Sequence, residues 1–433
     1  MQSLMLYQLP SPGKDIVKYI EKHGTPATYS RFHRQAQIQN GAIIYMHQTK
    51  ERMSFVNEPR FKGKTFYHVT NPYEHVINNN KDDRSDIAAY SKLYFDNTSL
   101  NIVSRAFYKI WEILMLFDPI PSSGHMVSAH LAEAPGSFVQ SLMYYREKFY
   151  KNHAKDEHYT ISIEDQDVPA FKKDFRRVYP KVKIYEQDGG DLTTRQSITG
   201  FEKFSKKADL ITGDGGFTWT NENYQEQEAF RLILGEIIAA FKIQKSGGTF
   251  ILKIFETYTD VSIKLMLLLS ATYEDTFLFK PYTSRPSNSE KYIVCRGFKG
   301  VSDKLIESLL QLLEDMNEHH ESGQKIADLL PDFPIPDNYR STFIISSSHL
   351  TSTQFIAINK MVEFVNSNEY YGNQYHQYLK NQQDANDSWV QMFYPIGNSD
   401  YTSVRRILNG FLESSLIESQ SRVDEFISEI LSP

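Results

Sequence analysis

The sequence predicts an α/β fold in which helices cover both faces of a mostly parallel seven-stranded sheet. Short apolar runs with strand-like composition alternate with helical patterns through the middle of the chain, and this alternation is typical of βαβ units. The seven expected strands are residues 126–132, 159–163, 182–186, 208–212, 249–255, 275–279 and 291–295. Sheets of this kind bind ligands at the carboxyl ends of their strands, so we expect the functional site there.

Length and composition favour a packed protein of two or three domains. The chain has 433 residues, of which 40% are hydrophobic and 23% charged. The net charge of −6 predicts that any contact with nucleic acid depends on a local basic patch. Cys295 is the single cysteine, which excludes an intrachain disulfide and a cysteine-rich zinc site. We expect it to be a buried structural thiol, and we expect no metal.

The chain shows neither of the two common signals for export or membrane insertion. No N-terminal stretch has the charged-then-apolar pattern of a signal peptide. No segment reaches the roughly 18 uninterrupted apolar residues of a membrane span. We therefore expect a soluble, intracellular protein without a membrane partner, and the sequence leaves its oligomeric state open.

The regions on either side of the predicted sheet differ from it. Residues 1–85 lack a clear period, and we expect an N-terminal extension packed on the core. Its basic segments, such as 60–64, could contact RNA, although a solvated surface explains them equally well. Residues 86–300 form the expected α/β domain, which opens with a helix over 102–116 capped by Ser99 or Asn101. Residues 301–433 predict a helical C-terminal region, with helical stripes over 304–319 and 354–365.

Within the α/β domain, the strand over 126–132 leads into a tight turn at Pro135-Gly136 and then into a helix from about Ser137. Gly136 has no side chain, so a ligand could approach the backbone closely. The free amides at the start of the helix would face that ligand. An ordinary turn between a strand and a helix is the alternative.

Four charged residues follow the predicted elements in order: Lys109, Asp214, Lys253 and Glu290. Lys253 lies inside the apolar strand 249–255, where burying a lysine is costly unless it reaches a cleft or a charged partner. The other three also have structural explanations, as a surface lysine, a turn residue and a charge at a strand end.

Together these segments resemble the FtsJ-type RNA ribose 2′-O-methyltransferases, whose fold is Rossmann-like. The resemblance rests on the phrases SRAFYKIWE at 104–112, EAPG at 133–136, DGG at 214–216, GGTFILK at 247–253 and SRPSNSEKYIV at 284–294. They cover roughly residues 90–300, and their sequences are most similar to those of mRNA cap 2′-O-methyltransferases, including those of some large DNA viruses. Two positions depart from the family pattern: His130 stands where many members have an acid, and Ser137 replaces a glycine.

The resemblance implies that Lys109, Asp214, Lys253 and Glu290 form a catalytic tetrad, and that S-adenosylmethionine is the methyl donor. The enzyme would align a ribose 2′-oxygen with the activated methyl group and ease away the proton of the hydroxyl. Burial and the second cation at Lys109 are expected to lower the pKa of Lys253, which could then accept or orient that proton. Asp214 and Glu290 would hold the two lysines in position.

The resemblance also implies binding residues and partners. Cofactor contacts are expected from Glu133, Ala134, Pro135, Gly136, Ser137, Phe138, Glu164 (or its neighbour Asp165), Asp191 and Asp214. Substrate contacts to phosphates or hydroxyls are expected from Arg105, Ser284, Arg285 and Asn288. The expected partners are RNA, especially capped mRNA, and other capping enzymes, in the cytoplasm, at a viral replication site or in the nucleus.

Three alternatives remain beside this interpretation. The first is an rRNA- or tRNA-directed methyltransferase of the same fold. The second is a catalytically inactive RNA-binding scaffold, although such a protein has no physical reason to keep Lys253 inside a strand. The third is a dinucleotide-dependent oxidoreductase, which would carry G-x-G-x-x-G after the first strand, where this chain has EAPGS at 133–137.

Overall fold

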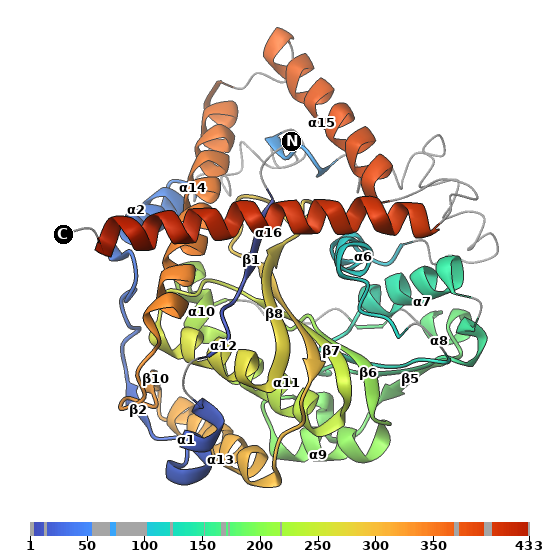
Figure 1. The fold of residues 1–433 in the computed structure, drawn as a ribbon, viewed down its shortest axis with the longest axis vertical. Helices are drawn as coiled ribbons and strands as arrows, with labels where there is room; N and C mark the ends of the chain where they lie inside the picture. Colours follow the sequence, from blue (N-terminus) through green and yellow to red (C-terminus); the bar gives the residue numbers. More distant parts are fainter. Residues whose placement is uncertain are drawn as a thin grey trace.

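The structure is a computed structural model, and it describes residues 4–12, 15–53, 70–74, 102–121, 124–150, 152–165, 170–171, 174–216, 219–367, 372–393 and 401–431. In these ranges a central sheet is covered by helices on both faces (Figure 1). The basic segment 60–64 and the cap candidates Ser99 and Asn101 lie outside the described residues. Of the helices in these ranges, none has the length and apolar character that crossing a lipid bilayer requires.

The central sheet has eight strands in the order β1-β8-β9-β7-β6-β3-β4-β5. Its strands are β1 (Met5–Gln8), β3 (Val127–Leu131), β4 (Glu157–Ile161), β5 (Val182–Tyr185), β6 (Ala208–Gly213), β7 (Gln244–Ile254), β8 (Tyr273–Lys280) and β9 (Lys291–Phe298). The strands from β5 to β7 pair in parallel, whereas β9 is antiparallel to both β7 and β8. All seven predicted strands are present, and the predicted fold class is confirmed.

The eighth strand, β1, was not predicted. It pairs antiparallel with β8, so that Met5 lies opposite Lys280. The four residues of β1 are too few to show a period-2 pattern, and the strand therefore has no signal in the sequence. The N-terminal segment thus contributes directly to the edge of the central sheet.

The sheet is buried on both faces, as expected for a sheet with parallel strands in its centre. Alternate residues of β6 and β7 enter two separate hydrophobic cores: Leu210 and Ile251 belong to one, and Ile211 and Phe250 to the other. Helices α6 (Ala106–Phe117) and α7 (Ser137–Phe149) complete the first core. Helices α9 (Arg195–Phe204), α11 (Phe230–Ile243) and α12 (Asp260–Thr272) complete the second.

Two predicted helices have different bounds in the structure. Helix α6 begins at Ala106 rather than at 102, because Ser104 precedes it in a turn in which its hydroxyl accepts a hydrogen bond from the Ala106 amide at 3.2 Å. The stretch over 225–243 also has a long helical pattern in the sequence, and in the structure it is divided at Ala229 into α10 (Gln225–Glu228) and α11. Glu226 of α10 accepts hydrogen bonds from the backbone of Tyr258 and Thr259, which ties α10 to the segment after β7.

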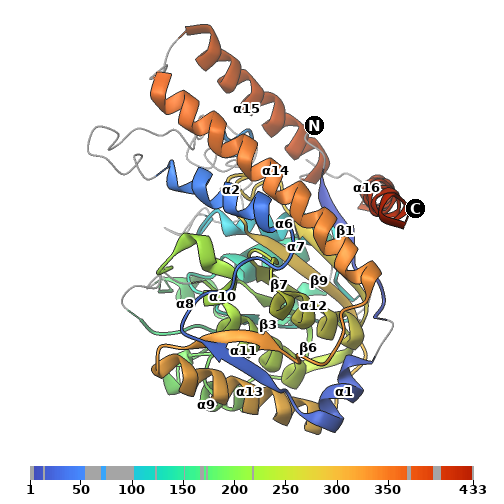
Figure 2. The same cartoon turned by 90° about the vertical axis from the view of Figure 1, so that its left-hand side faces the viewer.

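The chain segments before and after the α/β core wrap around it. Strands β2 (Ala27–Ser30) and β10 (Lys325–Leu329) pair in a separate two-stranded sheet, so the C-terminal region includes one strand besides its helices (Figure 2). Helix α2 (Asn40–Glu51) packs against α14 (Asp337–Ser367), and α16 (Tyr401–Leu431) crosses over β1 (Figure 1). The remaining α-helices described are α1 (Ile16–His23), α8 (Phe175–Val178), α13 (Asp303–Glu321) and α15 (Gly372–Phe393).

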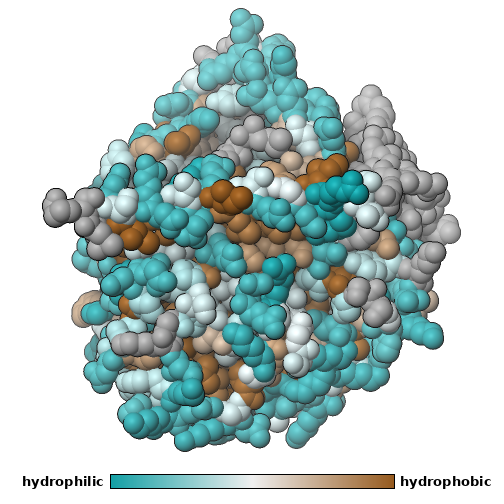
Figure 3. Space-filling view, in the orientation of Figure 1, coloured by the Kyte–Doolittle hydropathy of each residue, from teal (hydrophilic) through white to brown (hydrophobic). Residues whose placement is uncertain are grey.

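On the face seen in Figure 3, hydrophilic side chains predominate and hydrophobic ones form separate patches. The division of the chain at residues 86 and 300 stays a prediction.

Candidate active site

A cavity of about 730 Å³ opens at the carboxyl ends of β3, β4, β6 and β7. Its lining comes mainly from the ends of these strands and from the segments that follow them and β5, and it includes Ala134, Asp165, Asp191, Asp214 and Lys253. The volume is in the range of small-molecule sites, roughly 300–1,000 Å³. The fold therefore places a ligand-sized space at the sheet edge where the strand ends meet.

Lys253 extends from β7 into this cavity and pairs with Asp214, the residue that follows β6. Its ammonium lies 3.2 Å from the Asp214 carboxylate and donates a 2.8 Å hydrogen bond to the main-chain carbonyl of the same residue. Tyr292 of β9 donates a 3.2 Å hydrogen bond to the same carboxylate. These contacts provide the compensation that a lysine inside a buried strand requires.

The pKa of Lys253 differs from the sequence-based expectation. Burial lowers this pKa, but the carboxylates of Asp214 and Glu290 raise it by more, so that it lies above its ordinary value. The second cation, Lys109, does not reverse the result because its charge is compensated by an ion pair with Glu290. Lys253 is therefore an ammonium group at neutral pH.

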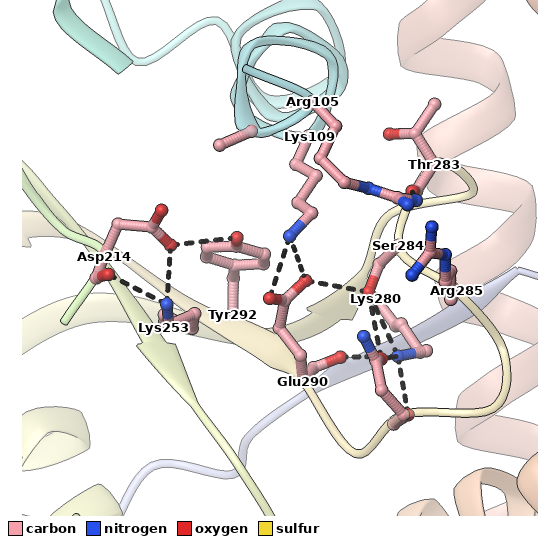
Figure 4. Close-up of polar contacts among 12 residues, drawn as sticks. Arg105, Lys109, Asp214, Lys253, Lys280, Thr283, Ser284, Arg285, Glu290 and Tyr292 are labelled. Carbon is pink, nitrogen blue, oxygen red and sulfur yellow. Dashed lines mark hydrogen bonds and ion pairs between the residues drawn. The ribbon is translucent and has the colours of Figure 1, made fainter. Parts of the chain in front are cut away.

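Lys109 and Glu290 form the second charged pair of the site (Figure 4). The ammonium of Lys109 lies 2.7 and 2.8 Å from the two carboxylate oxygens of Glu290, and Ser284 donates a 2.9 Å hydrogen bond to Glu290. Burial favours the neutral form of Glu290, but Lys109, Lys253 and Lys280 together lower its pKa to about 2. In Figure 4 the ring of Tyr292 lies between the two charged pairs.

Lys280, the last residue of β8, is a charged residue of the site that was not predicted. Its ammonium donates to the side-chain and main-chain oxygens of Asn288 at 2.7 and 3.0 Å, to the main-chain carbonyl of Glu290 at 2.6 Å and to Ser284 at 3.2 Å. Burial lowers the pKa of Lys280 to about 7. The residue lies just beyond the predicted strand 275–279 and before a proline, where the sequence gives no sign of burial.

Two buried glutamates that were also missed fix the loops of the site. Glu112 of α6 accepts hydrogen bonds from the amides of Tyr282 and Thr283 at 2.7 and 2.8 Å, and burial raises its pKa to about 7. Glu236 of α11 accepts a 3.1 Å hydrogen bond from the amide of Gly215, and burial raises its pKa to about 8. Each lies within an apolar helical run, which is the same signal that identified Lys253.

The predicted cofactor positions divide into two groups. Ala134, Asp191 and Asp214 line the cavity, and so does Asp165, the alternative to Glu164. The positions that do not appear in the described lining are Glu133, Pro135, Gly136, Ser137, Phe138 and Glu164.

Several residues of this second group have structural contacts instead. One carboxylate oxygen of Glu133 accepts hydrogen bonds from the amides of Phe138 and Val139, both at 2.9 Å, and so caps the start of α7. The Ser137 hydroxyl lies 2.7 Å from that of Ser104, which ties α7 to the start of α6. Phe138 packs in the hydrophobic core beneath α6 and α7. These contacts explain the residue types without a ligand.

The glycines near the cavity have two different explanations. Gly136 has a φ of +105°, and a Cβ there would lie 2.3 Å from the ring of Phe175, so packing explains its missing side chain. Gly216 lines the cavity, and a Cβ there would lie 3.3 Å from the Lys253 ammonium. The glycine at 216 thus keeps the approach to Lys253 open.

His130, which departs from the family pattern, lies inside the sheet. One ring nitrogen is 2.8 Å from the Thr212 hydroxyl and the other is 2.8 Å from the Ser128 hydroxyl. Burial holds the pKa of His130 well below its ordinary value. The imidazole is therefore neutral and part of a buried polar ladder between β3 and β6.

Three of the four predicted substrate positions, Arg105, Ser284 and Arg285, lie together near Glu290 (Figure 4). Arg105 and Arg285 both pair with the buried carboxylate of Glu74, at 3.1 and 2.9 Å. Ser284 and Asn288 contact Lys280, and Asn288 also lines the cavity. The loop over 281–290 is thus held by Glu74, through Arg285, and by Lys280.

Comparisons with known proteins show which sequences the chain is similar to. Residues 102–298 match the family model of FtsJ-like methyltransferases. The chain is 31% identical over 262 residues to "Cap-specific mRNA (nucleoside-2'-O-)-methyltransferase 2" of Pongo abelii, which covers 56% of this chain and 33% of that protein. It is 34% identical over 185 residues to "Cap-specific mRNA (nucleoside-2'-O-)-methyltransferase 1" of Ailuropoda melanoleuca, which covers 41% of this chain and 22% of that protein.

A third relative is viral. An uncharacterised protein of Acanthamoeba polyphaga mimivirus is 29% identical over 237 residues, which is 49% of this chain and 28% of that protein. In all three cases the match spans a third or less of the relative's length. The resemblance that the motifs predicted is confirmed for residues 102–298.

Proposed function

We propose that this protein methylates the ribose 2′-oxygen of a cap-proximal nucleotide of mRNA, because residues 102–298 match the family model of FtsJ-like methyltransferases. The main support is the position of the Lys253–Asp214 and Lys109–Glu290 pairs at the cavity edge. The cap-specific activity named for two relatives supports mRNA as the substrate class. Other capping enzymes stay the expected partners.

The cavity is suited to S-adenosylmethionine, the cofactor of FtsJ-like methyltransferases. The carboxylates of Asp165, Asp191 and Asp214 give its lining acceptors for hydroxyl and amino groups and a negative field that favours a cation. Ala134 would contribute an apolar contact beside them. When bound, the cofactor supplies a methyl group on a positively charged sulfur.

In this proposal the two lysines act mainly by orientation and charge. Lys253 already carries its proton, and the pKa of Glu290 is about 2, so neither group accepts a proton readily at neutral pH. Lys253 would donate a hydrogen bond to the 2′-oxygen and stabilise negative charge that develops there as the hydroxyl proton leaves to solvent. Lys109 would provide a second cation nearby, and the fixed alignment would supply much of the acceleration.

The first test is methyl transfer from labelled S-adenosylmethionine to short capped and uncapped RNAs, followed by digestion to locate the label. We expect label on a ribose next to the cap. The Lys253→Ala variant should lose transfer but keep cofactor binding by calorimetry. Lys245→Ala is a matched control, because Lys245 lies on the same strand but pairs with Asp209 at 2.7 Å, away from the cavity. Near-normal activity of Lys253→Ala would reject the tetrad.

The same assay separates the alternatives. Transfer to structured uncapped RNA but not to capped RNA would assign the enzyme to the rRNA- or tRNA-directed branch. Absence of both transfer and cofactor binding in the wild-type protein would favour a non-catalytic RNA-binding role.

A further inference from the structure

A second cavity, of about 200 Å³, adjoins the first and shares Glu228 and Arg231 with it. The residues around it come from α10 and α11, from the end of α13, from β10 and from the segment that follows β2, which lie on the side shown in Figure 2. Besides Arg231, its lining includes three other basic residues, His33, His320 and Lys325. The function proposed above assigns no role to this space.

The lining of the second cavity carries an excess of positive charge. Arg231 and Lys325 make no ion pair within the described parts of the chain; Arg231 donates one hydrogen bond, to Asn317 at 2.9 Å. Glu228 is the one carboxylate in the described lining, and its oxygens accept hydrogen bonds from the backbone amides of Thr220 and Asn221. Glu228 also lies 3.9 Å from the His33 ring. The lining thus sets two cations, Arg231 and Lys325, against one carboxylate.

The positive charges of the lining also lower the pKa values of its two imidazoles. Burial lowers the pKa of His33, and the charge of Lys325 lowers it further. The pKa of His320 is lowered by burial and by the charges of Arg231 and Lys325. Both imidazoles therefore favour their neutral form, and an anion in this space would be attracted by Arg231 and Lys325.

The N-terminal segment over 31–34 contributes His33 to the lining of this cavity and carries an exposed aromatic ring next to it in sequence. The Gln227 side chain bonds to both the amide and the carbonyl of Arg34, at 2.7 and 2.8 Å, and the His33 ring stacks on Tyr224 at 4.1 Å. Phe32, in contrast, is 81% exposed. Single-stranded RNA is commonly bound by aromatic rings that stack on bases beside cations that contact phosphates.

We propose that the second cavity is a phosphate-binding site for the RNA substrate, in which Arg231 and Lys325 contact a backbone phosphate and Phe32 stacks on a neighbouring base. This inference rests on the proposed function, because it takes RNA as the ligand. The wall shared with the first cavity places the phosphate site next to the catalytic one. An RNA longer than the reacting nucleotide would therefore contact both.

The test uses the full chain with Lys325→Glu, which reverses one of the two cations without removing a buried apolar group. Lys304→Glu is the matched control, because Lys304 is exposed on α13. Affinity for a capped single-stranded RNA is measured by fluorescence anisotropy at several salt concentrations. Loss of a charged phosphate contact should weaken binding about tenfold, and it should reduce the slope of log affinity against log salt by about 0.7. The control should match the wild type.

A second variant, Phe32→Ala, tests the base contact without a charge change, and it should weaken RNA binding roughly fivefold or more. Both variants should keep the affinity for S-adenosylmethionine, and both should raise KM for RNA while leaving kcat near the wild-type value. Unchanged RNA affinity in Lys325→Glu and Phe32→Ala would overturn the inference. The RNA assignment would also be overturned if inorganic phosphate bound the wild-type cavity while Lys325→Glu left RNA affinity unchanged.

The binding experiment does not depend on methyl transfer. A wild-type protein that bound RNA but transferred no methyl group would reject the proposed methyltransferase activity, and the effect of Lys325→Glu on RNA affinity would still decide the phosphate site.

Discussion

Glu290 is surrounded by three ammonium groups, and its ionisation should therefore contribute to the stability of the folded protein. The pKa of its carboxyl is about 2 in the folded protein, against an ordinary value of 4.5. A carboxyl whose pKa is lower in the folded than in the unfolded state contributes stability above the unfolded pKa, here 4.5, and the contribution is lost as the pH falls toward 2.

We predict that Glu290→Gln destabilises the protein at pH 7 by about 3 kcal/mol, the free energy that corresponds to the difference between these two pKa values. The loss should be smaller at pH 3, where the wild type has already lost part of this contribution. Denaturant unfolding at the two pH values measures both quantities. Glu321→Gln, at the exposed end of α13, should change little. A loss that is equal at pH 3 and pH 7 would mean that the charge of Glu290 is not its cause.

Lys280 is a positioning residue, since it contacts the loop that carries Asn288 and Glu290 rather than the cavity itself. We predict that Lys280→Met leaves cofactor affinity unchanged but lowers kcat by about 10- to 100-fold, because a shift of about 1 Å in Glu290 and its partner Lys109 disturbs the alignment of the reacting groups. Steady-state kinetics and calorimetry separate the two effects. The exposed Lys299→Met is the control, and a matching kcat for the two variants would contradict the prediction.

Without the family resemblance, the sequence indicates a charged residue of the site only where a charge interrupts an apolar pattern. Lys253 stands out for this reason, and Glu112 and Glu236 have the same signal in apolar helical runs. Lys280 could not be identified, because its burial depends on the loop over 281–290 and on β1. Neither segment has a sequence pattern that predicts its position beside Lys280. The direction of the pKa shift of Lys253 could not be predicted either, because it depends on distances between side chains from four elements.

At the scale of elements, the start of α7 shows how a segment that resembles a family motif, EAPG at 133–136, can serve the fold. The motif residue Glu133 accepts two backbone hydrogen bonds from the first turn of α7, and burial raises its pKa well above the ordinary value. The motif therefore predicts the turn correctly, while the contact of Glu133 with the cofactor stays a prediction that a variant can test.

We predict that Glu133→Gln is nearly neutral for both stability and cofactor affinity, because an uncharged amide oxygen can accept the same two hydrogen bonds. Glu133→Ala should destabilise the protein by about 1–2 kcal/mol, since the amides of Phe138 and Val139 lose their buried acceptor. Thermal unfolding and calorimetry with S-adenosylmethionine measure the two quantities. A large loss of cofactor affinity in Glu133→Gln, with stability unchanged, would assign the carboxyl to the ligand instead.

At the scale of the whole molecule, segments far apart in the sequence complete one edge of the sheet. The first described strand, β1, pairs with β8, and Ser419 of α16 donates a hydrogen bond to the Leu6 carbonyl. The alternating pattern predicts the central strands well because each is long enough to show its period. It does not predict which terminal segment covers the edge, because that choice depends on contacts between residues about 400 positions apart.

If β1 and α16 are integral to the core, shortening a buried side chain of β1 should leave a cavity that destabilises the entire protein. Leu6 is fully buried in the core that also contains α6 and α7, so Leu6→Ala should cost about 2–5 kcal/mol in the free energy of unfolding. Leu379→Ala makes the same chemical change at a side chain that is 41% exposed on α15, and it should cost less than about 1 kcal/mol. Denaturant unfolding followed by circular dichroism compares the two. Because Met5 pairs with Lys280, we also expect Leu6→Ala to lower methyl transfer at temperatures below its unfolding transition. Equal stability of the two variants would mean that the sheet folds without β1 and that the terminal segments are peripheral to it.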